Sequence, residues 1–458
     1  MGQNAVKQSR VERALAGLPS WTRNEVFWLV AVFVLVAVTS WLRIAPTDQQ
    51  AIWAEDGPIF LKQQLENGTL ASLLQPYAGY QHFLPRLFTA GLVQTIPLEH
   101  FDRGVFIVCV LFAGFVGAAT FRLTRGILTW LPARFFMAIV PVMVPLLSRE
   151  IIGDLANIHT YCLWLTAWIA VARIGTRGEG IFWAVVVLAC TLTEFQAVVI
   201  VPFILLKLIW DRSFAHIAVA LGAIIGAGTQ VYTWLNFPRG TESDEVVVLA
   251  DVVVGWLANA ILPIWNGDVK ANAVYLAENG TSFLWLGLIP FVLAAAITLI
   301  CGRNPERFAI STLLLVSALT FGGSLFVNPF WFFQFSEIEG QEWLLVLLDL
   351  RYGASAGMFA LACLPFAASA FVSRVSPRLP VLSRIAAAGT IIVLFAYVAM
   401  QWPEVRTARA TSEAWTPQWR EAVVACEADP ESVHQFETAP DYRKFEITCA
   451  GVLGAPGS

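Results

Sequence analysis

The chain carries two adjacent carboxylates in the stretch Trp53-Ala54-Glu55-Asp56-Gly57-Pro58. This stretch follows the first long apolar run, Val26 to Leu42, so the carboxylates are expected just outside a membrane. The Gly57-Pro58 pair stops a helix and holds the loop tight. The run that follows, Ile59 to Leu74, is predicted to form an amphipathic helix. Most of the remaining chain is expected to form a scaffold around this loop.

The composition indicates a polytopic membrane protein. Its 458 residues are 57% hydrophobic and only 14% charged, which is too little charge to cover the surface of a soluble protein of this size. The 18 Trp and 32 Phe suit aromatic belts at a membrane surface and a cavity for an apolar ligand. The chain has no basic run and no interleaving of basic and aromatic residues, so nucleic acid is not an expected partner.

Eleven apolar runs are long enough, or nearly so, to cross a membrane. They are 26–43, 104–121, 134–148, 158–173, 181–194, 196–210, 214–235, 282–301, 308–328, 353–373 and 385–402. The short loops on the N-terminal side are rich in Arg and Lys, and only five of the 33 acidic residues fall there. The positive-inside rule then predicts a multi-pass protein of the plasma (inner) membrane with a cytoplasmic N-terminus and an extracytoplasmic C-terminus. The first run lacks a small-residue cleavage site and is expected to stay as a signal-anchor.

This orientation decides two ambiguous runs. Counting 84–97 as a span would place the basic loop 122–134 outside, so this run is predicted to be an interfacial or re-entrant helix within a large first extracytoplasmic loop, residues 44–103. The run 181–210 must contain two short spans, because both of its flanks are basic. Each half would give about 21 Å of helix, short of the hydrocarbon core of about 30 Å. Glu194, between the halves, should therefore lie below the outer membrane surface.

Undersized helices are also expected on both sides of a polar segment that contains Glu150, Asp154, Asn157 and His159. Polar residues are tolerated at membrane depth only where they line a cavity. Glu150, Asp154 and Asn157 would share one face if the segment is helical. The sequence thus predicts a water-accessible cup, open outward, with an acidic floor. A closed structural hydrogen-bond network is the alternative for these residues.

The expected fold is an all-α polytopic membrane protein with about 11 transmembrane helices. Residues 1–402 would form the transmembrane module, and residues 403–458 a small extracytoplasmic C-terminal segment. Cys426 and Cys449 lie in that polar segment. Since disulfides form outside the cytosol, a disulfide between these two cysteines is predicted.

The pair Glu55 and Asp56 is the first candidate for chemistry. Adjacent carboxylates can take a proton from an acceptor hydroxyl, or hold a divalent cation, and no cofactor beyond such a cation is expected. The alternative is a solvated surface pair that caps a helix.

A first outer loop that opens with an acidic pair, on an eleven-span body with a polar outer tail, resembles the GT-C superfamily of integral-membrane glycosyltransferases. The resemblance implies a polyprenyl-phosphate-linked sugar as donor and a first-loop carboxylate, Asp56 or Glu55, as catalytic base. The stretch Tyr77 to Arg86 looks like the donor-side part of the same loop. Arg351-Tyr352 is similar to an Arg-Tyr pair of that superfamily in which the Arg faces the lipid phosphate.

Other polar residues are candidates for substrate contact. Arg351 can hold a phosphate by bidentate hydrogen bonds, or it can lie among lipid headgroups. Tyr80, His82 and Arg86 would contact the donor phosphate or the sugar, with headgroup contact as the alternative for His82 and Arg86. These positions imply membrane lipid as a partner in either case.

The remaining two candidates belong to the expected cup. Glu194 is either a second carboxylate of the site or a partner of Arg149, since an acid at membrane depth needs a role or a partner. His159 taken alone is more often a structural partner than a ligand.

The inner loops are short and carry no phosphate-binding Gly-rich loop, which favours an outward-facing enzyme fed by a lipid-linked donor. The expected reaction is an inverting hexosyl or pentosyl transfer from polyprenyl phosphate to an extracytoplasmic glycan or glycolipid acceptor. One alternative is a transporter or flippase of a lipid-linked or polar solute, which would use the same acids as proton or cation sites. A non-catalytic assembly subunit is another.

Overall fold

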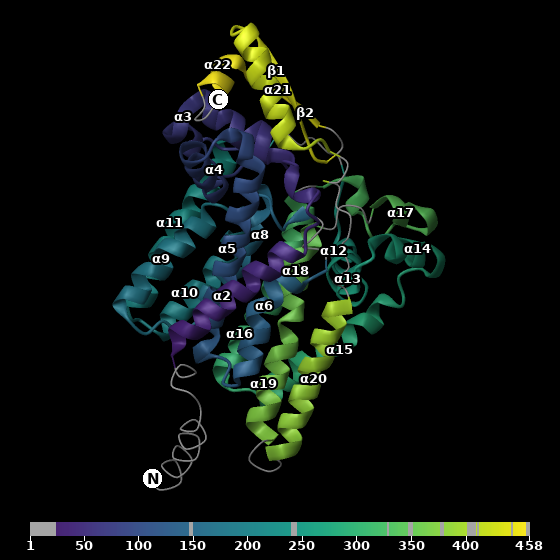
Figure 1. The fold of residues 1–458 in the computed structure, drawn as a ribbon. Coiled ribbons are helices and arrows are strands. Elements are labelled where there is room, and N and C mark those ends of the chain that lie inside the picture. Colours follow the sequence, from purple (N-terminus) through teal and green to yellow (C-terminus); the bar gives the residue numbers. More distant parts are fainter. Residues whose placement is uncertain are drawn as a thin grey trace.

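The computed structural model describes residues 24–145, 150–239, 245–327, 329–346, 351–375, 380–400, 409, 412–440 and 443–454. Six helical segments in these ranges are long and apolar enough to cross a membrane. They are Glu25–Leu42, Leu98–Gly126, Phe214–Asn236, Leu284–Cys301, Asn304–Val327 and Arg351–Arg374. The chain is thus a mostly helical, multi-pass membrane protein, in agreement with its composition (Figure 1).

The helices of these six segments form the body of the bundle. They are α2 (Glu25–Leu42), α5 (Phe101–Leu123), α11 (Phe214–Asn236), α15 (Leu284–Cys301), α16 (Asn304–Val327), α18 (Arg351–Leu361) and α19 (Cys363–Val375). The other helices of the body are α6 (Leu131–Met143), α8 (His159–Val171), α9 (Arg177–Thr191), α10 (Val201–Trp210) and α20 (Pro380–Met400). To one side of it lie α12 (Leu249–Trp256), α13 (Leu262–Trp265), α14 (Val269–Asn279) and α17 (Trp343–Val346) (Figure 1).

Four helices are as short as the sequence predicts. Helices α6 and α8 have 13 residues each, α9 has 15 and α10 has 10, so their lengths are about 15–23 Å. The run 181–210 divides into α9 and α10, because the chain leaves the helical path after Thr191 and forms a 3₁₀ segment over Phe195–Ile200. Glu194 lies at this break, as expected.

The first outer loop contains two helices, of which one differs from the prediction. The run 84–97 forms a helix of its own, α4 (Phe83–Thr95). The preceding helix α3 (Lys62–Leu74) is not amphipathic as predicted: the polar side chains of Gln64 and Ser72 are buried, while Leu70 and Leu74 are exposed. The helical period is interrupted at Gly68, whose φ of +75° takes the backbone out of the α-helical region.

Small residues allow close packing between α9 and α11. A Cβ on Gly222 of α11 would lie 2.4 Å from the carbonyl oxygen of Ala184 in α9, so only glycine fits at this contact. Close approach of backbones at small residues is typical of helix pairs in membranes. This pair forms one wall of the bundle and supports the break at Glu194.

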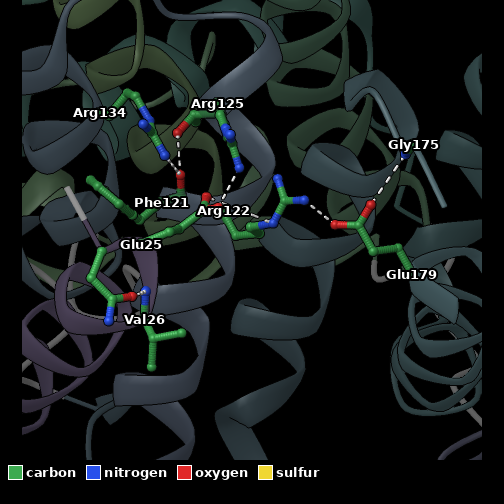
Figure 2. Close-up of polar contacts among 10 residues, drawn as sticks. Glu25, Val26, Phe121, Arg122, Arg125, Arg134, Gly175 and Glu179 are labelled. Carbon is green, nitrogen blue, oxygen red and sulfur yellow. Dashed lines mark hydrogen bonds and ion pairs between the residues drawn. The ribbon is translucent and has the colours of Figure 1, made fainter.

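Basic residues expected on the cytoplasmic side meet acidic partners at one end of the bundle. Arg122, at the end of α5, pairs with Glu179 of α9 and lies 3.9 Å from Glu25 of α2, and Arg125 pairs with Glu25 as well. Figure 2 shows these side chains pointing towards one another. Loops that are distant in the sequence therefore come together at this end.

The opposite end of the bundle carries the C-terminal segment, defined here as the cap: residues 409, 412–440 and 443–454. It consists of α21 (Trp415–Ala428), the antiparallel strands β1 (Val433–Thr438) and β2 (Arg443–Thr448), and α22 (Cys449–Leu453). A disulfide joins Cys426 to Cys449 with their Cα atoms 5.0 Å apart, as the sequence predicted. The cap lies next to α3 and the start of α5 (Figure 1). It contacts the chain at Leu98, just before α5, about 34 Å of helix away from Arg122.

Candidate functional site

A cavity of about 520 Å³ opens beneath the first loop. Eight of the residues singled out from the sequence line it: Glu55, Tyr80, His82, Asn157, His159, Glu194, Arg351 and Tyr352. They come from the first loop, the start of α8, the break after α9 and the start of α18. The cavity therefore brings together segments that lie up to about 300 positions apart in the sequence.

The two adjacent carboxylates point in different directions. Glu55 is half-buried and lines the cavity, whereas Asp56 is fully buried and does not. Asp56 Oδ2 accepts a hydrogen bond from Leu155 N–H at 2.9 Å, and its Oδ1 accepts one from Ala156 N–H at 2.8 Å. Asp56 thus caps the helical segment that begins at Ala156, the usual place for a carboxylate at a helix N-terminus. The structure therefore leaves Glu55, and not Asp56, facing the cavity.

Asp56 belongs to a buried charged unit that the sequence did not reveal. Arg409 Nη2 donates to Asp154 Oδ2 at 2.7 Å, and both side chains are almost completely buried. Asp154 Oδ1 also accepts the N–H of Asn157 at 2.7 Å. Arg409 supplies one positive charge for two carboxylates, and burial raises the pKa of both, that of Asp56 to about 7. Arg409 stands 255 positions from Asp154 in the chain, so no local pattern could indicate this pair.

The raised pKa of Asp56 makes stability depend on pH. The unfolded chain titrates near 3.8 at this residue, so the folded protein keeps a proton that the unfolded chain releases. The stabilisation is complete below about pH 4 and is lost as the pH rises to about 7. We expect the free energy of unfolding of Asp56→Asn, relative to wild type, to rise by about 1.4 kcal/mol per pH unit between about pH 5 and 7. Denaturant unfolding in detergent across this range measures it.

The matched control for this prediction is Glu446→Gln. Glu446 is an exposed carboxylate on β2, and its replacement should leave the pH dependence unchanged. A pH-independent difference between Asp56→Asn and wild type would contradict a raised pKa at Asp56.

The segment that precedes α8 is not one helix. Gly153 has φ +89°, and a Cβ there would lie 2.6 Å from the ring of Phe106, so the chain turns sharply at this glycine. As a result Glu150, Asp154 and Asn157 do not share a helical face. Asn157 lines the cavity and its Nδ2 donates to the backbone carbonyl of Glu150 at 3.0 Å, while Asp154 faces Arg409. For Asp154 the structural hydrogen-bond network, named as the alternative, is what the geometry shows.

Glu194 and His159 form a pair on the cavity wall. Glu194 Oε2 contacts His159 Nδ1, and Glu194 Oε1 accepts the N–H of Gln196 at 2.7 Å. Both carboxylate oxygens are thus engaged, and the contact fixes the imidazole with Nε2 as the nitrogen that Glu194 does not engage. Arg149, the alternative partner for Glu194, lies outside the described residues. The imidazole is therefore held in a fixed orientation at the cavity.

The aromatic turn of the first loop packs around His82. The rings of Tyr80 and Tyr77 lie 4.0 and 5.5 Å from the imidazole between ring centres. Burial, with the neighbouring charge of Arg86, holds the pKa of His82 well below its ordinary value. His82 is therefore neutral at neutral pH and offers hydrogen bonds to a ligand without a positive charge.

Arg86 does not reach the cavity. Its guanidinium is buried, donates from Nη1 to Gln63 Oε1 at 2.8 Å, and lies 5.5 Å from the ring centre of Phe60. The guanidinium thus points towards α3, which contains Gln63. Of the two predicted phosphate-binding arginines, only Arg351 lines the cavity.

Two arginines, Arg351 and Arg239, line the cavity. Arg351 stacks on Tyr352 with 5.2 Å from its guanidinium carbon to the ring centre. Arg239, just beyond the end of α11, lines the same cavity and was missed by sequence reasoning. Its position directly after Pro238, at the end of a helix long enough to span a membrane, was the signal that could have found it. Burial raises the pKa of Tyr77, which lines the same cavity, and the nearby carboxylate of Glu55 raises it as well.

Part of the cavity wall is apolar and exposed at the surface of the bundle. Trp234 and Leu235 of α11 and Val327 of α16 line it, and their side chains are 45%, 66% and 43% exposed on spanning helices. Lipid is the surrounding medium of such surfaces. A polar chamber is thus continuous with an apolar opening between α11 and α16.

The arrangement does not fit the divalent cation that the sequence left open. The two oxygens of Asp56 already accept backbone N–H groups, so Glu55 and Asp56 do not converge on a common point. Among the described residues, no three His, Cys, Asp or Glu side chains are grouped to hold a metal ion.

Compared with known proteins, the chain matches no protein-family model, no curated protein sequence and no solved structure. Its functional interpretation therefore depends on the geometry of the cavity: a carboxylate, a fixed imidazole and two arginines in a chamber with an apolar opening.

Proposed function

We propose that this protein is a membrane glycosyltransferase of the GT-C type, which moves one sugar from a polyprenyl phosphate to a hydroxyl of an extracytoplasmic glycan or glycolipid. The observation that carries the proposal is the single cavity in which Glu55, the Glu194–His159 pair and Arg351 meet an apolar opening between α11 and α16. An amphiphilic substrate with a phosphate between its sugar and its hydrocarbon chain matches such a chamber in charge and polarity.

Each end of the cavity has a role in this reaction. Glu55 takes the proton of the acceptor hydroxyl, and the oxygen attacks the anomeric carbon. The bond from that carbon to the phosphate oxygen breaks, and its electron pair leaves with the polyprenyl phosphate. Arg351, with Arg239 close by, stabilises the charge that develops on the phosphate. Attack from the side opposite the leaving group gives inversion.

The orientation in the membrane is part of the proposal. The cavity and the cap would face the extracytoplasmic side of the plasma (inner) membrane, and the Arg122–Glu179 end would face the cytoplasm. The six long helices, with α6, α8, α9, α10 and α20, would give the expected eleven spans.

The test is to incubate the purified protein in lipid nanodiscs with a panel of polyprenyl-phosphate sugars and a mixture of envelope glycans, and to measure release of free polyprenyl phosphate. Consumption of one donor that depends on Glu55 supports the proposal. Movement of a labelled donor across the bilayer without its consumption would favour the transporter or flippase instead.

Arg351 gives a sharper form of this test. We expect Arg351→Gln to lower kcat/KM for the donor by about 10- to 100-fold, because a hydrogen bond to a charged group contributes about 1.5–3 kcal/mol. Arg351→Lys keeps the charge but loses bidentate geometry, and should retain an intermediate activity. Initial rates at several donor concentrations measure both. Equal activity of Arg351→Gln and wild type would remove the phosphate role.

A further inference from the structure

The cap is bonded to the first loop at the residues just before Glu55. Trp53 and Ala439 form a parallel β-bridge, in which Ala54 N–H donates to Ala439 O at 2.5 Å and Ala439 N–H donates to Ile52 O at 2.9 Å. Ala54 donates the first of these bonds and directly precedes Glu55. Its φ is +30°. An L-residue rarely adopts this conformation unless its surroundings impose it. The bridge to the cap is the contact that holds Ala54 in place.

A second link runs through Arg409. Its guanidinium carbon lies 5.2 Å from the ring centre of Trp53, and its Nη2 donates to Asp154 Oδ2 at 2.7 Å. Asp154 in turn accepts the N–H of Asn157, which lines the cavity. Arg409 therefore ties the stretch that carries Glu55 to the segment before α8, which also lines the cavity.

A third contact lies on the other side of Glu55. Gly57 packs so closely on the strands of the cap that a Cβ there would lie 2.8 Å from Phe445 Cζ and 3.0 Å from Thr438 Cγ2. Glu55 is thus held on both sides, at Ala54 and at Gly57, by one element from the other end of the sequence.

The cap has its own anchor away from the cavity. Trp415 Nε1 donates to the carbonyl of Leu98 at 2.7 Å, and Thr416 Oγ1 donates to the carbonyl of Glu99 at 2.8 Å. These bonds fix α21 to the start of the long helix α5. The cap therefore contacts the first loop from a position that is fixed by its bonds to the bundle.

We infer that the cap is a positioning element for Glu55, and that Arg409 is the positioning residue that couples the cap to the first loop and to the segment before α8. Arg409 does not line the cavity, so it acts through the residues that it contacts, among them Trp53 and Asp154. The kinetic part of this inference rests on the proposed function, while its structural part does not. Loosening the cap should lower kcat without weakening donor binding, since a misplacement of about 1 Å costs about 100-fold in rate.

The experiment compares full-length Arg409→Met and Arg409→Lys with wild type in nanodiscs. Hydrogen exchange of residues 52–58 is followed by mass spectrometry, with α14 (Val269–Asn279) as the reference segment. We expect Arg409→Met to speed exchange of the Ala54 amide at least about 10-fold, to leave α14 unchanged, and to lower kcat about 100-fold with donor KM within about twofold of wild type. Arg409→Lys keeps the positive charge and should recover part of both effects.

The two readouts separate the inference from the proposed function. If wild type consumes no donor, the function fails, and the exchange of residues 52–58 still decides whether the cap holds the loop. Unchanged exchange in a folded Arg409→Met protein would overturn the inference, and so would a loss confined to KM. If Arg409→Met does not fold, Phe445→Leu loosens the contact at Gly57 and is held to the same outcomes.

Discussion

Glu55→Gln is expected to lower kcat for sugar transfer by about 10²- to 10⁴-fold, the contribution of a well-placed general base. Glutamine keeps the size and hydrogen bonding of the side chain but cannot accept the proton. Glu55 is half-buried and its side chain lines the cavity, so folding should be unaffected. Rates of polyprenyl-phosphate release at saturating donor, with thermal unfolding of the same sample, measure both quantities.

The neighbouring Asp56→Asn is the matched control. It is expected to lower stability and to leave the chemistry of the folded protein unchanged. The asparagine side chain has a single carbonyl oxygen, which can accept only one of the N–H groups of Leu155 and Ala156. Its NH₂ group then faces the other N–H group. The protein should lose about 1–3 kcal/mol of stability, most strongly at low pH, while the folded fraction keeps its chemistry. A stable but inactive Asp56→Asn beside a fully active Glu55→Gln would show that the base has been assigned to the wrong carboxylate.

Removal of the cap disulfide is expected to have the second largest effect. The bond joins Cys426 in α21 to Cys449 at the start of α22, 23 positions apart, and encloses both strands of the cap. Closing a loop of this length lowers the conformational entropy of the unfolded chain, which stabilises the folded state by about 3 kcal/mol. The variant Cys426→Ser/Cys449→Ser should therefore lower the free energy of local unfolding of the cap by about that amount, as measured by hydrogen exchange in β1 and β2.

Cys301→Ser is the control for this variant, because Cys301 is a free, partly exposed thiol in α15, away from the cap. It should leave exchange in the cap unchanged. If the double variant exchanged at the wild-type rate as well, packing alone would be sufficient to hold the cap.

Regular features of the fold could be predicted from local patterns. Glu194 follows a 15-residue helix. Its position could be predicted because the length of a helix depends only on the nearby sequence. The charge of the flanking loops, through the orientation it implies, predicted α4 as a helix of its own and the division of 181–210. It was wrong for α3, because one glycine, Gly68, changes the helical phase and leaves Leu70 and Leu74 exposed.

The sequence by itself determined that this protein lies in a membrane, that several of its helices are too short to span it fully, and that acids collect next to them. Composition and run length decide these properties, because the cost of burying charge in lipid does not depend on the details of packing. Only the tertiary structure decided which carboxylate of the pair faces the cavity. Glu55 and Asp56 are neighbours in a single 3₁₀ turn, Ala54–Asp56, which is too short for a sequence period to show which side chain faces inward. Their directions follow from the amides of Leu155 and Ala156 and from an arginine near the far end of the chain.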